Sequence, residues 1–176
     1  MTIVQLVTQI FSTLTLLSNI AIIFVIMLLI FKKGGKMIHF LANNAVLLSF
    51  IIALVATLGS LFYSEIAGYD PCKLCWLQRI AMYPMVIIFL VALLKKERKS
   101  IDSAFILSLI GGAVAIYHYI GQLGFVNLPC PVVGYSVTCS KIFFLNYGYI
   151  TFPFIAFSAF ALIAMLHYLN KKFVTL

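Results

Sequence analysis

The sequence alternates between long apolar stretches and short clusters of charged or turn-forming residues. An apolar helix of about 20 residues spans the roughly 30 Å hydrocarbon core of a bilayer. The alternation expected of transmembrane β-strands is absent, so each long stretch is predicted to be a helix. The five predicted helices cover residues 3–31, 37–63, 76–95, 103–120 and 149–168.

Composition leads to the same fold class. Of the 176 residues, 64% are apolar and only 9% are charged, whereas an ordinary soluble domain has about 25% charged residues. A soluble fold, a disordered chain and a collagen-like chain are therefore excluded. Five helices use most of the chain, which leaves no room for a separate soluble domain. We predict an all-α, polytopic helical bundle surrounded by membrane lipid.

The formal charge of +8 sets topology in this prediction and does not indicate a nucleic-acid partner. The cations lie in clusters between apolar stretches, and no basic face is interleaved with aromatic residues. Nine cations fall on one side of the predicted bundle and three on the other. The positive-inside rule then places the C-terminus on the inner side of the membrane, with the N-terminus and the loops 64–75 and 121–148 outside. The nine are Lys32, Lys33, Lys36, Lys95, Lys96, Arg98, Lys99, Lys171 and Lys172, and the three are Lys73, Arg79 and Lys141.

The first apolar stretch is predicted to be a retained helix. It has no basic residue before its apolar part and is too long for a signal peptide. It is also the most polar of the five, with Gln5, Gln9, Ser12 and Asn19 among its side chains. We therefore expect one of its faces to pack against protein rather than lipid.

All four cysteines lie in the two predicted outer loops, as the pairs Cys72/Cys75 and Cys130/Cys139. Cysteines that served only as small apolar residues would be scattered through the helices. Two pairs on the outer face, where disulfides persist, favour thiol–disulfide chemistry.

The first pair has a spacing that commonly lowers a thiol pKa. Cys75 begins the third predicted helix, where free N–H groups and the helix dipole favour a thiolate. Arg79 follows one turn later and could hold an anionic thiolate or a polarised carbonyl at the membrane surface. The alternative for Arg79 is a simple interfacial anchor whose charge reaches the headgroups.

The second pair lies in a proline-rich segment. Pro131 restricts Cys130 to extended backbone, and Pro129 precedes it. An extended, exposed disulfide is easy for an incoming thiolate to attack. Two alternatives remain: a purely structural disulfide, or a zinc site made of all four cysteines, for which the spacing of the second pair is poorly suited.

Three stretches in the correct order resemble the disulfide bond formation protein B (DsbB) family, especially its short-loop, BdbC-like members. The residues from Pro71 to Ile80 (PCKLCWLQRI), followed by Met82-Tyr83-Pro84, resemble the signature of the family. The stretch Tyr117-His118-Tyr119 and the segment from Cys139 to Pro153 resemble the end of its third core helix and the start of its last. The resemblance covers roughly residues 40–170.

The resemblance implies a four-helix membrane enzyme that reoxidises a thioredoxin-fold thiol oxidase outside the cytoplasm. It implies that the electrons pass to a membrane quinone, either ubiquinone or menaquinone. The partner's thiolate would attack Cys130, Cys139 would attack Cys72, and Cys75 would be released as a thiolate facing the quinone. Arg79, His118 and Gln78 would lie at the quinone site. No metal is expected.

The chain departs from the family pattern in two ways. It carries an additional helix at its N-terminus, so we expect residues 1–36 to precede a four-helix core at 37–176. The loop between Cys130 and Cys139 is also short, so the resemblance does not predict the surface on which the partner docks. Alternative functions are a quinone reductase of the vitamin K epoxide reductase type, or a non-enzymatic bundle with structural disulfides or a four-cysteine metal site. The oligomeric state is not predicted.

Overall fold

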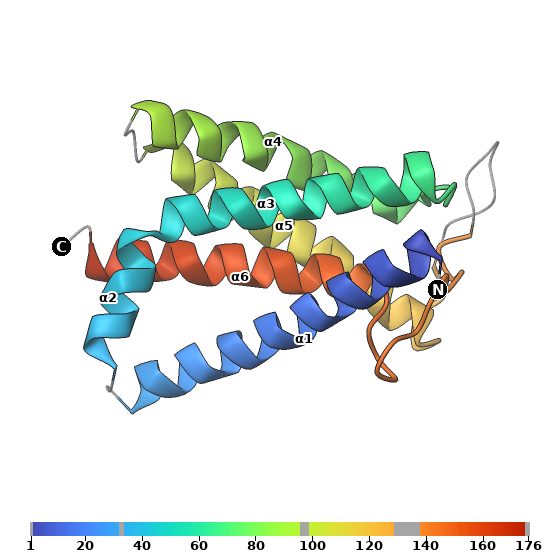
Figure 1. Cartoon of the computed structure of the whole chain (residues 1–176), viewed down its shortest axis with the longest axis horizontal. Coiled ribbons are helices and arrows are strands. Elements are labelled where there is room, and N and C mark those ends of the chain that lie inside the picture. The colour runs from blue at the N-terminus through green and yellow to red at the C-terminus, as the bar shows by residue number, and fades with distance from the viewer. Residues whose placement is uncertain (1, 32–33, 96–98, 129–137, 175–176) are drawn as a thin grey trace.

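The computed structural model describes residues 2–31, 34–95, 99–128 and 138–174. Within these ranges the chain forms six α-helices, one π-helical turn and no β-strand. Five of the helical segments are long and apolar enough to cross a membrane, which confirms the predicted helical membrane bundle (Figure 1). The elements are α1 (Ile3–Ile30), α2 (Gly35–Asn43), α3 (Ala45–Leu61), the π-turn η1 (Phe62–Ile66), α4 (Lys73–Lys95), α5 (Lys99–Gln122) and α6 (Phe152–Phe173).

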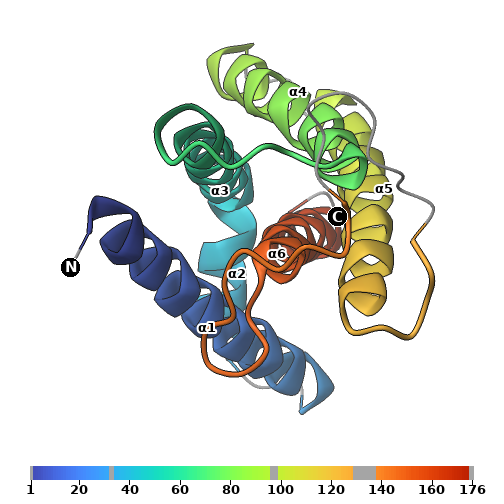
Figure 2. The same ribbon diagram turned by 90° about the vertical axis from the view of Figure 1, so that its right-hand side faces the viewer.

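Helices α3, α4, α5 and α6 pack around one core, as the view along the bundle shows (Figure 2). Met85 and Phe89 of α4 meet Phe160 and Ile163 of α6 there, and all four are at most 1% exposed. Many large apolar side chains on the outer faces are exposed, as expected where the surrounding solvent is lipid. The CxxC segment and the chain that enters α6 lie at the same end of this bundle, here called the cysteine end (Figure 1).

The prediction of one continuous helix over residues 37–63 is wrong, because the helix is interrupted at Asn44. Asn44 ends α2 with φ −96° and ψ 9°, outside regular helical geometry, and α2 turns away from the line of α3 (Figure 1). The Asn44 side chain donates a hydrogen bond to the Phe40 carbonyl at 2.9 Å. Asn170 of α6 donates to the Ala42 carbonyl at 2.7 Å. These side-chain amides satisfy carbonyls at the end of α2, which an apolar pattern alone cannot predict.

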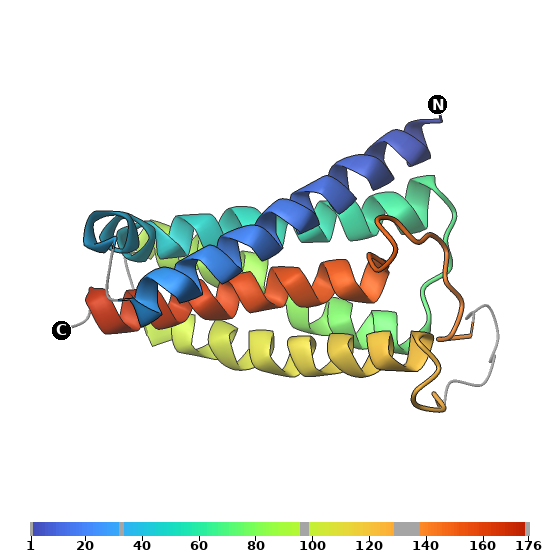
Figure 3. The same ribbon diagram turned by 90° about the horizontal axis from the view of Figure 1, so that it is seen from below.

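Helix α1 runs diagonally across α3 and α6 (Figure 3). Ser12 is buried as predicted, together with Thr8 and Thr15, whereas Gln5 and Gln9 are exposed. Part of the polar face therefore packs against protein. Tyr63 donates a hydrogen bond to Thr8 Oγ1 at 3.0 Å, and the Asn146 amide donates to Ser12 Oγ at 2.8 Å. These bonds join α1 to the cysteine end of the bundle.

Helices α5 and α6 approach closely at Gly111. A Cβ atom there would lie 2.3 Å from Cζ of Phe160, whereas a Cβ at Gly112 would lie 3.6 Å from Cβ of Phe160. Phe160 is 1% exposed and belongs to the packed core with Met85 and Phe89, so its ring must shift to admit a methyl group at Gly111. The two adjacent glycines therefore differ sharply in what they tolerate.

We predict that Gly111→Ala lowers the free energy of unfolding by about 1–3 kcal/mol, the usual cost of overpacking a core. Gly112→Ala is the matched control and should leave stability unchanged or slightly improved, since alanine favours helix. Thermal unfolding of the two variants in detergent measures the difference. Equal midpoints would contradict the close approach at Gly111.

Candidate active site

The CxxC segment caps the start of α4. Cys72 directly precedes the helix, and its Sγ accepts a hydrogen bond from the Cys75 backbone N–H at 3.3 Å. The Cys72 carbonyl accepts from the N–H of Trp76 at 3.1 Å. A sulfur in this position takes the place of a polar capping side chain. The predicted location of Cys75 in the first turn of the third helix is confirmed.

Cys72 and Cys75 are free thiols whose Sγ atoms lie 2.9 Å apart. They are close enough to share a proton and to close into a disulfide with little backbone movement. The pKa of the Cys72 thiol is lowered, chiefly because the Cys75 thiol donates a hydrogen bond to it. Burial opposes this shift, and His118 supports it through a hydrogen bond. In this dithiol state, Cys72 is therefore the sulfur that loses its proton readily.

His118 of α5 joins the two cysteine pairs. Its Nε2 lies 2.9 Å from the Cys139 carbonyl oxygen and 3.8 Å from Cys72 Sγ. A carbonyl only accepts, so Nε2 carries the hydrogen. Nδ1 then accepts from the Gln78 side-chain amide at 3.1 Å. These contacts define a neutral imidazole with both nitrogens satisfied, in a side chain that is only 2% exposed.

The second pair is described only in part. Cys139 is disulfide-bonded and 1% exposed, while Cys130 lies outside the described residues. The sequence predicts an exposed disulfide, and this expectation is wrong for the Cys139 half. The Cys139 carbonyl lies instead beside His118, and the Sγ atoms of Cys72 and Cys75 lie near a ring nitrogen of the same histidine. The structure thus places three of the four predicted cysteines around one histidine.

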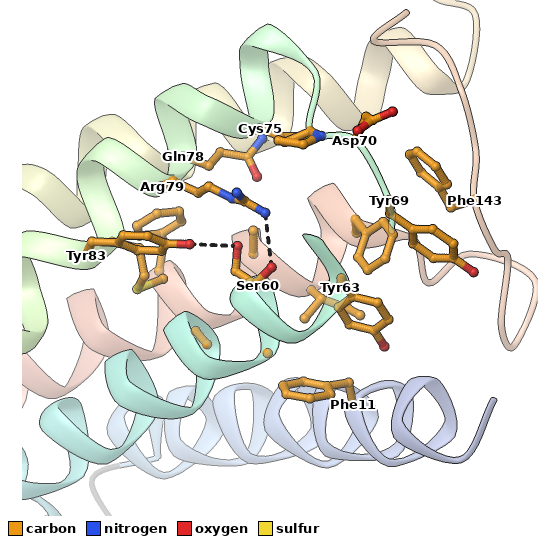
Figure 4. Close-up of a pocket in the computed structure, with 18 residues that line it drawn as sticks. Phe11, Ser60, Tyr63, Tyr69, Asp70, Cys75, Gln78, Arg79, Tyr83 and Phe143 are labelled. Carbon is orange, nitrogen blue, oxygen red and sulfur yellow. Dashed lines mark hydrogen bonds between the residues drawn. The ribbon is translucent and has the colours of Figure 1, made fainter. Parts of the chain in front are cut away.

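A cavity of about 140 Å³ opens beside Cys75 (Figure 4). Cys75, Gln78 and Arg79 of α4 line it together, as do Ser60 of α3 and Tyr83 of α4. Apart from the carboxylate of Asp70, the other lining residues are apolar or aromatic. His118 contacts the wall residue Gln78 through a hydrogen bond. The aromatic residues of the wall are Phe11, Tyr63, Tyr69, Phe143, Phe152 and Phe160.

Arg79 faces this cavity from within the bundle. Its Nη2 donates to the Ser60 carbonyl at 3.0 Å, and its guanidinium lies 5.3 Å from the Trp76 ring centroid. A side chain that anchored the helix at the headgroups would extend toward water. Arg79 is instead held by protein groups, and its charge is adjacent to the space that Cys75 borders.

Sequence reasoning missed several lining residues. Tyr83 lies four residues after Arg79 and therefore shares its helix face; its hydroxyl lies 3.3 Å from Ser60 Oγ. That spacing was a usable signal. Phe11 and Ser60 reach the cavity from other helices, and no local pattern indicates them.

The same residues have metal-binding chemistry. The Sγ atoms of Cys72 and Cys75 and a ring nitrogen of His118 lie within 4.8 Å of one another, and sulfur and imidazole are the usual ligands of zinc. A site made of all four cysteines would require Cys139 as a free thiolate, whereas this residue is disulfide-bonded.

Comparison with known proteins gives consistent matches. The family model described as "Disulfide bond formation protein DsbB" matches residues 42–170. A probable disulfide formation protein C of Halalkalibacterium halodurans is 43% identical over 122 residues, covering 69% of this chain and 88% of that protein. A probable disulfide formation protein of Oceanobacillus iheyensis is 44% identical over 131 residues, covering 73% and 89%. The disulfide bond formation protein C of Bacillus subtilis is 40% identical over 125 residues, covering 70% and 89%.

No solved structure matches the chain. The matched residues contain both cysteine pairs, Arg79 and His118, whereas α1 precedes them. The resemblance based on the CxLCxxQR stretch is thus confirmed. The chain belongs to the DsbB family of membrane disulfide bond formation proteins.

Proposed function

We propose that the chain is a protein-dithiol:quinone oxidoreductase. It would take electrons from a thioredoxin-fold thiol oxidase outside the cytoplasm and pass them to a membrane quinone. The observation that carries this proposal is a single cavity bordered by Cys75, Gln78 and Arg79, next to the contact of Cys72 and Cys139 with His118.

The cavity suits a quinone head group in size and chemistry. Its volume of about 140 Å³ is close to the roughly 150 Å³ of an engineered cavity that holds benzene. Aromatic walls offer stacking surfaces, and Arg79 and Gln78 offer donors to carbonyl oxygens. When bound, the quinone would accept two electrons and two protons as the Cys72/Cys75 dithiol closes to a disulfide.

The proposed relay begins with both pairs oxidised. A thiolate of the partner attacks Cys130, forms a mixed disulfide and releases Cys139 as a thiolate. Cys139 then attacks Cys72 and releases Cys75. The partner's second thiol displaces Cys130, which attacks Cys139 and releases Cys72. The partner has then become a disulfide, the Cys130–Cys139 bond has reformed, and Cys72 and Cys75 hold the two electrons.

His118 fits the role of a residue that assists the leaving sulfur. Its Nε2–H is bonded to the Cys139 carbonyl and lies 3.8 Å from Cys72 Sγ, so it can donate to the thiolate released there. Gln78 holds this tautomer by donating to Nδ1. A stabilised thiolate leaves faster in disulfide exchange.

We propose that residues 1–36 form an added helix and residues 37–176 the catalytic core. In the cytoplasmic membrane, the N-terminus and both cysteine loops would lie outside, and the C-terminus inside. The cation-rich ends support this orientation, since Lys95, Lys171 and Lys172 end α4 and α6 away from the cysteine end.

The first test is quinone reduction by the purified protein with a reduced thioredoxin-fold donor. We expect Cys75→Ser and Cys130→Ser to reduce the rate to background, because each removes a sulfur that exchange requires. Lys171→Met, at the opposite end of the bundle, should retain wild-type activity. A wild-type protein that reduces neither ubiquinone nor menaquinone, or that contains one zinc per chain, would refute the proposal.

Arg79 is predicted to set quinone affinity. Removing its charge by Arg79→Met deletes a charged hydrogen bond, usually worth about 1.5–3 kcal/mol. We therefore expect kcat/KM for quinone to fall about 10- to 100-fold, with a smaller loss in Arg79→Lys. The rate of thiol exchange with the partner, measured with no quinone present, should not change. A parallel loss in both steps would assign Arg79 to folding.

The Cys72 thiolate is predicted to persist to acidic pH in the reduced protein. Because its pKa is lowered, the thiolate absorbance should remain as the pH falls below the roughly 8.5 of a free cysteine. It should disappear only at the lowered pKa. Cys75→Ala removes the largest cause and should raise the midpoint. His118→Ala should raise it less.

This titration is best made in a Cys130→Ser/Cys139→Ser background, which leaves the first pair as the only thiols. Cys72→Ser is the control, and it should abolish the loss of thiolate absorbance at acidic pH. If Cys72 and Cys75 are both present and the midpoint lies at the pKa of a free cysteine, the assignment of Cys72 as a low-pKa thiolate is contradicted.

A further inference from the structure

A second hollow adjoins the cavity. It is an open groove between α1 and the segment formed by α3 and η1. Its lining is apolar except for Glu65 near the cysteine end. The lining residues are Val7, Phe11, Val55, Leu58, Gly59, Leu61, Phe62, Glu65 and Ile66.

The groove and the cavity share two residues, Phe11 and Gly59. The Phe11 ring sits directly on Gly59, where a Cβ atom would lie 2.4 Å from Phe11 Cζ. The ring also lies 6.2 Å from that of Tyr63, centroid to centroid. Figure 4 shows the Phe11 ring reaching the cavity from α1. Because Phe11 also lines the groove, it stands at the boundary between the two hollows, and only a glycine beneath it permits this position.

We propose that the groove holds the isoprenoid tail of the quinone and that α1 supplies one of its walls. This inference rests on the proposed function, since it assigns a second part of the same site. A tailed quinone needs an apolar exit from the cavity to the lipid, because a polyprenyl chain is longer than a space of about 140 Å³ can contain. The groove is apolar apart from Glu65 and shares Phe11 and Gly59 with the cavity. It lies between two helical segments that are long and apolar enough to cross a membrane.

Helix α1 is fixed where this role requires it. The Tyr63 hydroxyl bonds Thr8, and Gln9 Nε2 donates to the Tyr147 hydroxyl at 2.8 Å. These bonds hold the first half of α1 against η1 and the chain that enters α6. Residues 42–170 match the family model, so this wall of the groove is contributed from outside the matched region. Tail recognition by α1 would thus be a property of this chain's own N-terminal helix.

The kinetic test fills the groove without reaching the cavity. Leu58 is 57% exposed and lines only the groove, whereas Leu47 is 45% exposed on the same helix and lines neither hollow. Leu58→Trp and Leu47→Trp are therefore matched. Each is assayed with a four-isoprene quinone and with the same head group lacking a tail, for both ubiquinone and menaquinone heads.

We expect the wild type to prefer the tailed quinone in kcat/KM. Leu58→Trp should reduce this preference about tenfold, as for the loss of roughly two buried methylene groups. Leu47→Trp should keep the wild-type preference. Equal preferences in the two variants would overturn the groove assignment. Failure of the wild type to reduce either form would instead refute the proposed function.

A binding readout is independent of turnover. The purified full-length protein is irradiated with a quinone whose isoprenoid tail carries a diazirine, and the labelled peptides are identified by mass spectrometry. Labelling of residues 7–11 and 55–66 that excess unlabelled quinone removes would support the inference. Labelling confined to α4 or α5 would overturn it, and so would equal labelling by a diazirine phospholipid that quinone does not displace.

Discussion

The buried hydrogen bonds of His118 organise the reactive end of the molecule. Its Nε2–H binds the Cys139 carbonyl, its Nδ1 accepts from Gln78, and Cys72 Sγ lies 3.8 Å from Nε2. Since both ring nitrogens are engaged, the imidazole has one tautomer and one orientation. Three segments far apart in the sequence are thereby fixed at one point. The placement of Cys75 and Arg79 follows, because they lie on the same helix turns as Cys72 and Gln78.

The environment of this histidine also separates the roles of the two sulfurs. Cys72 is buried beside His118, and its pKa is lowered through the hydrogen bond from Cys75. Cys75 instead borders the cavity with Arg79. The proposed thiol exchange and electron transfer to a membrane acceptor need different surroundings, one facing a second disulfide and the other an apolar space. The start of α4 and the residue before it provide both within three residues.

Helix α1 shows how a membrane protein uses polar side chains. Lipid provides little driving force for helices to associate, so interhelical hydrogen bonds and close packing matter more. Thr8, Ser12 and Asn19 bond to Tyr63, Asn146 and Ser158. These polar contacts hold the first two thirds of α1 and with it Phe11 on Gly59 at the margin of the cavity, while Val25 packs against α2 and α6 further along the helix.

The sequence by itself determined the fold class, the long apolar segments and the placement of the CxxC pair beside Arg79, because these depend on local patterns. Apolar length predicts a membrane helix, and the CxLCxxQR stretch places Cys72, Cys75 and Arg79 at one helix start. It did not reveal the break at Asn44, the buried state of Cys139 or the part played by Phe11. Tertiary structure decided these, because each depends on contacts between segments distant in the chain. Asn170 satisfies the end of α2, His118 holds the Cys139 backbone, and the missing side chain of Gly59 admits a ring from another helix.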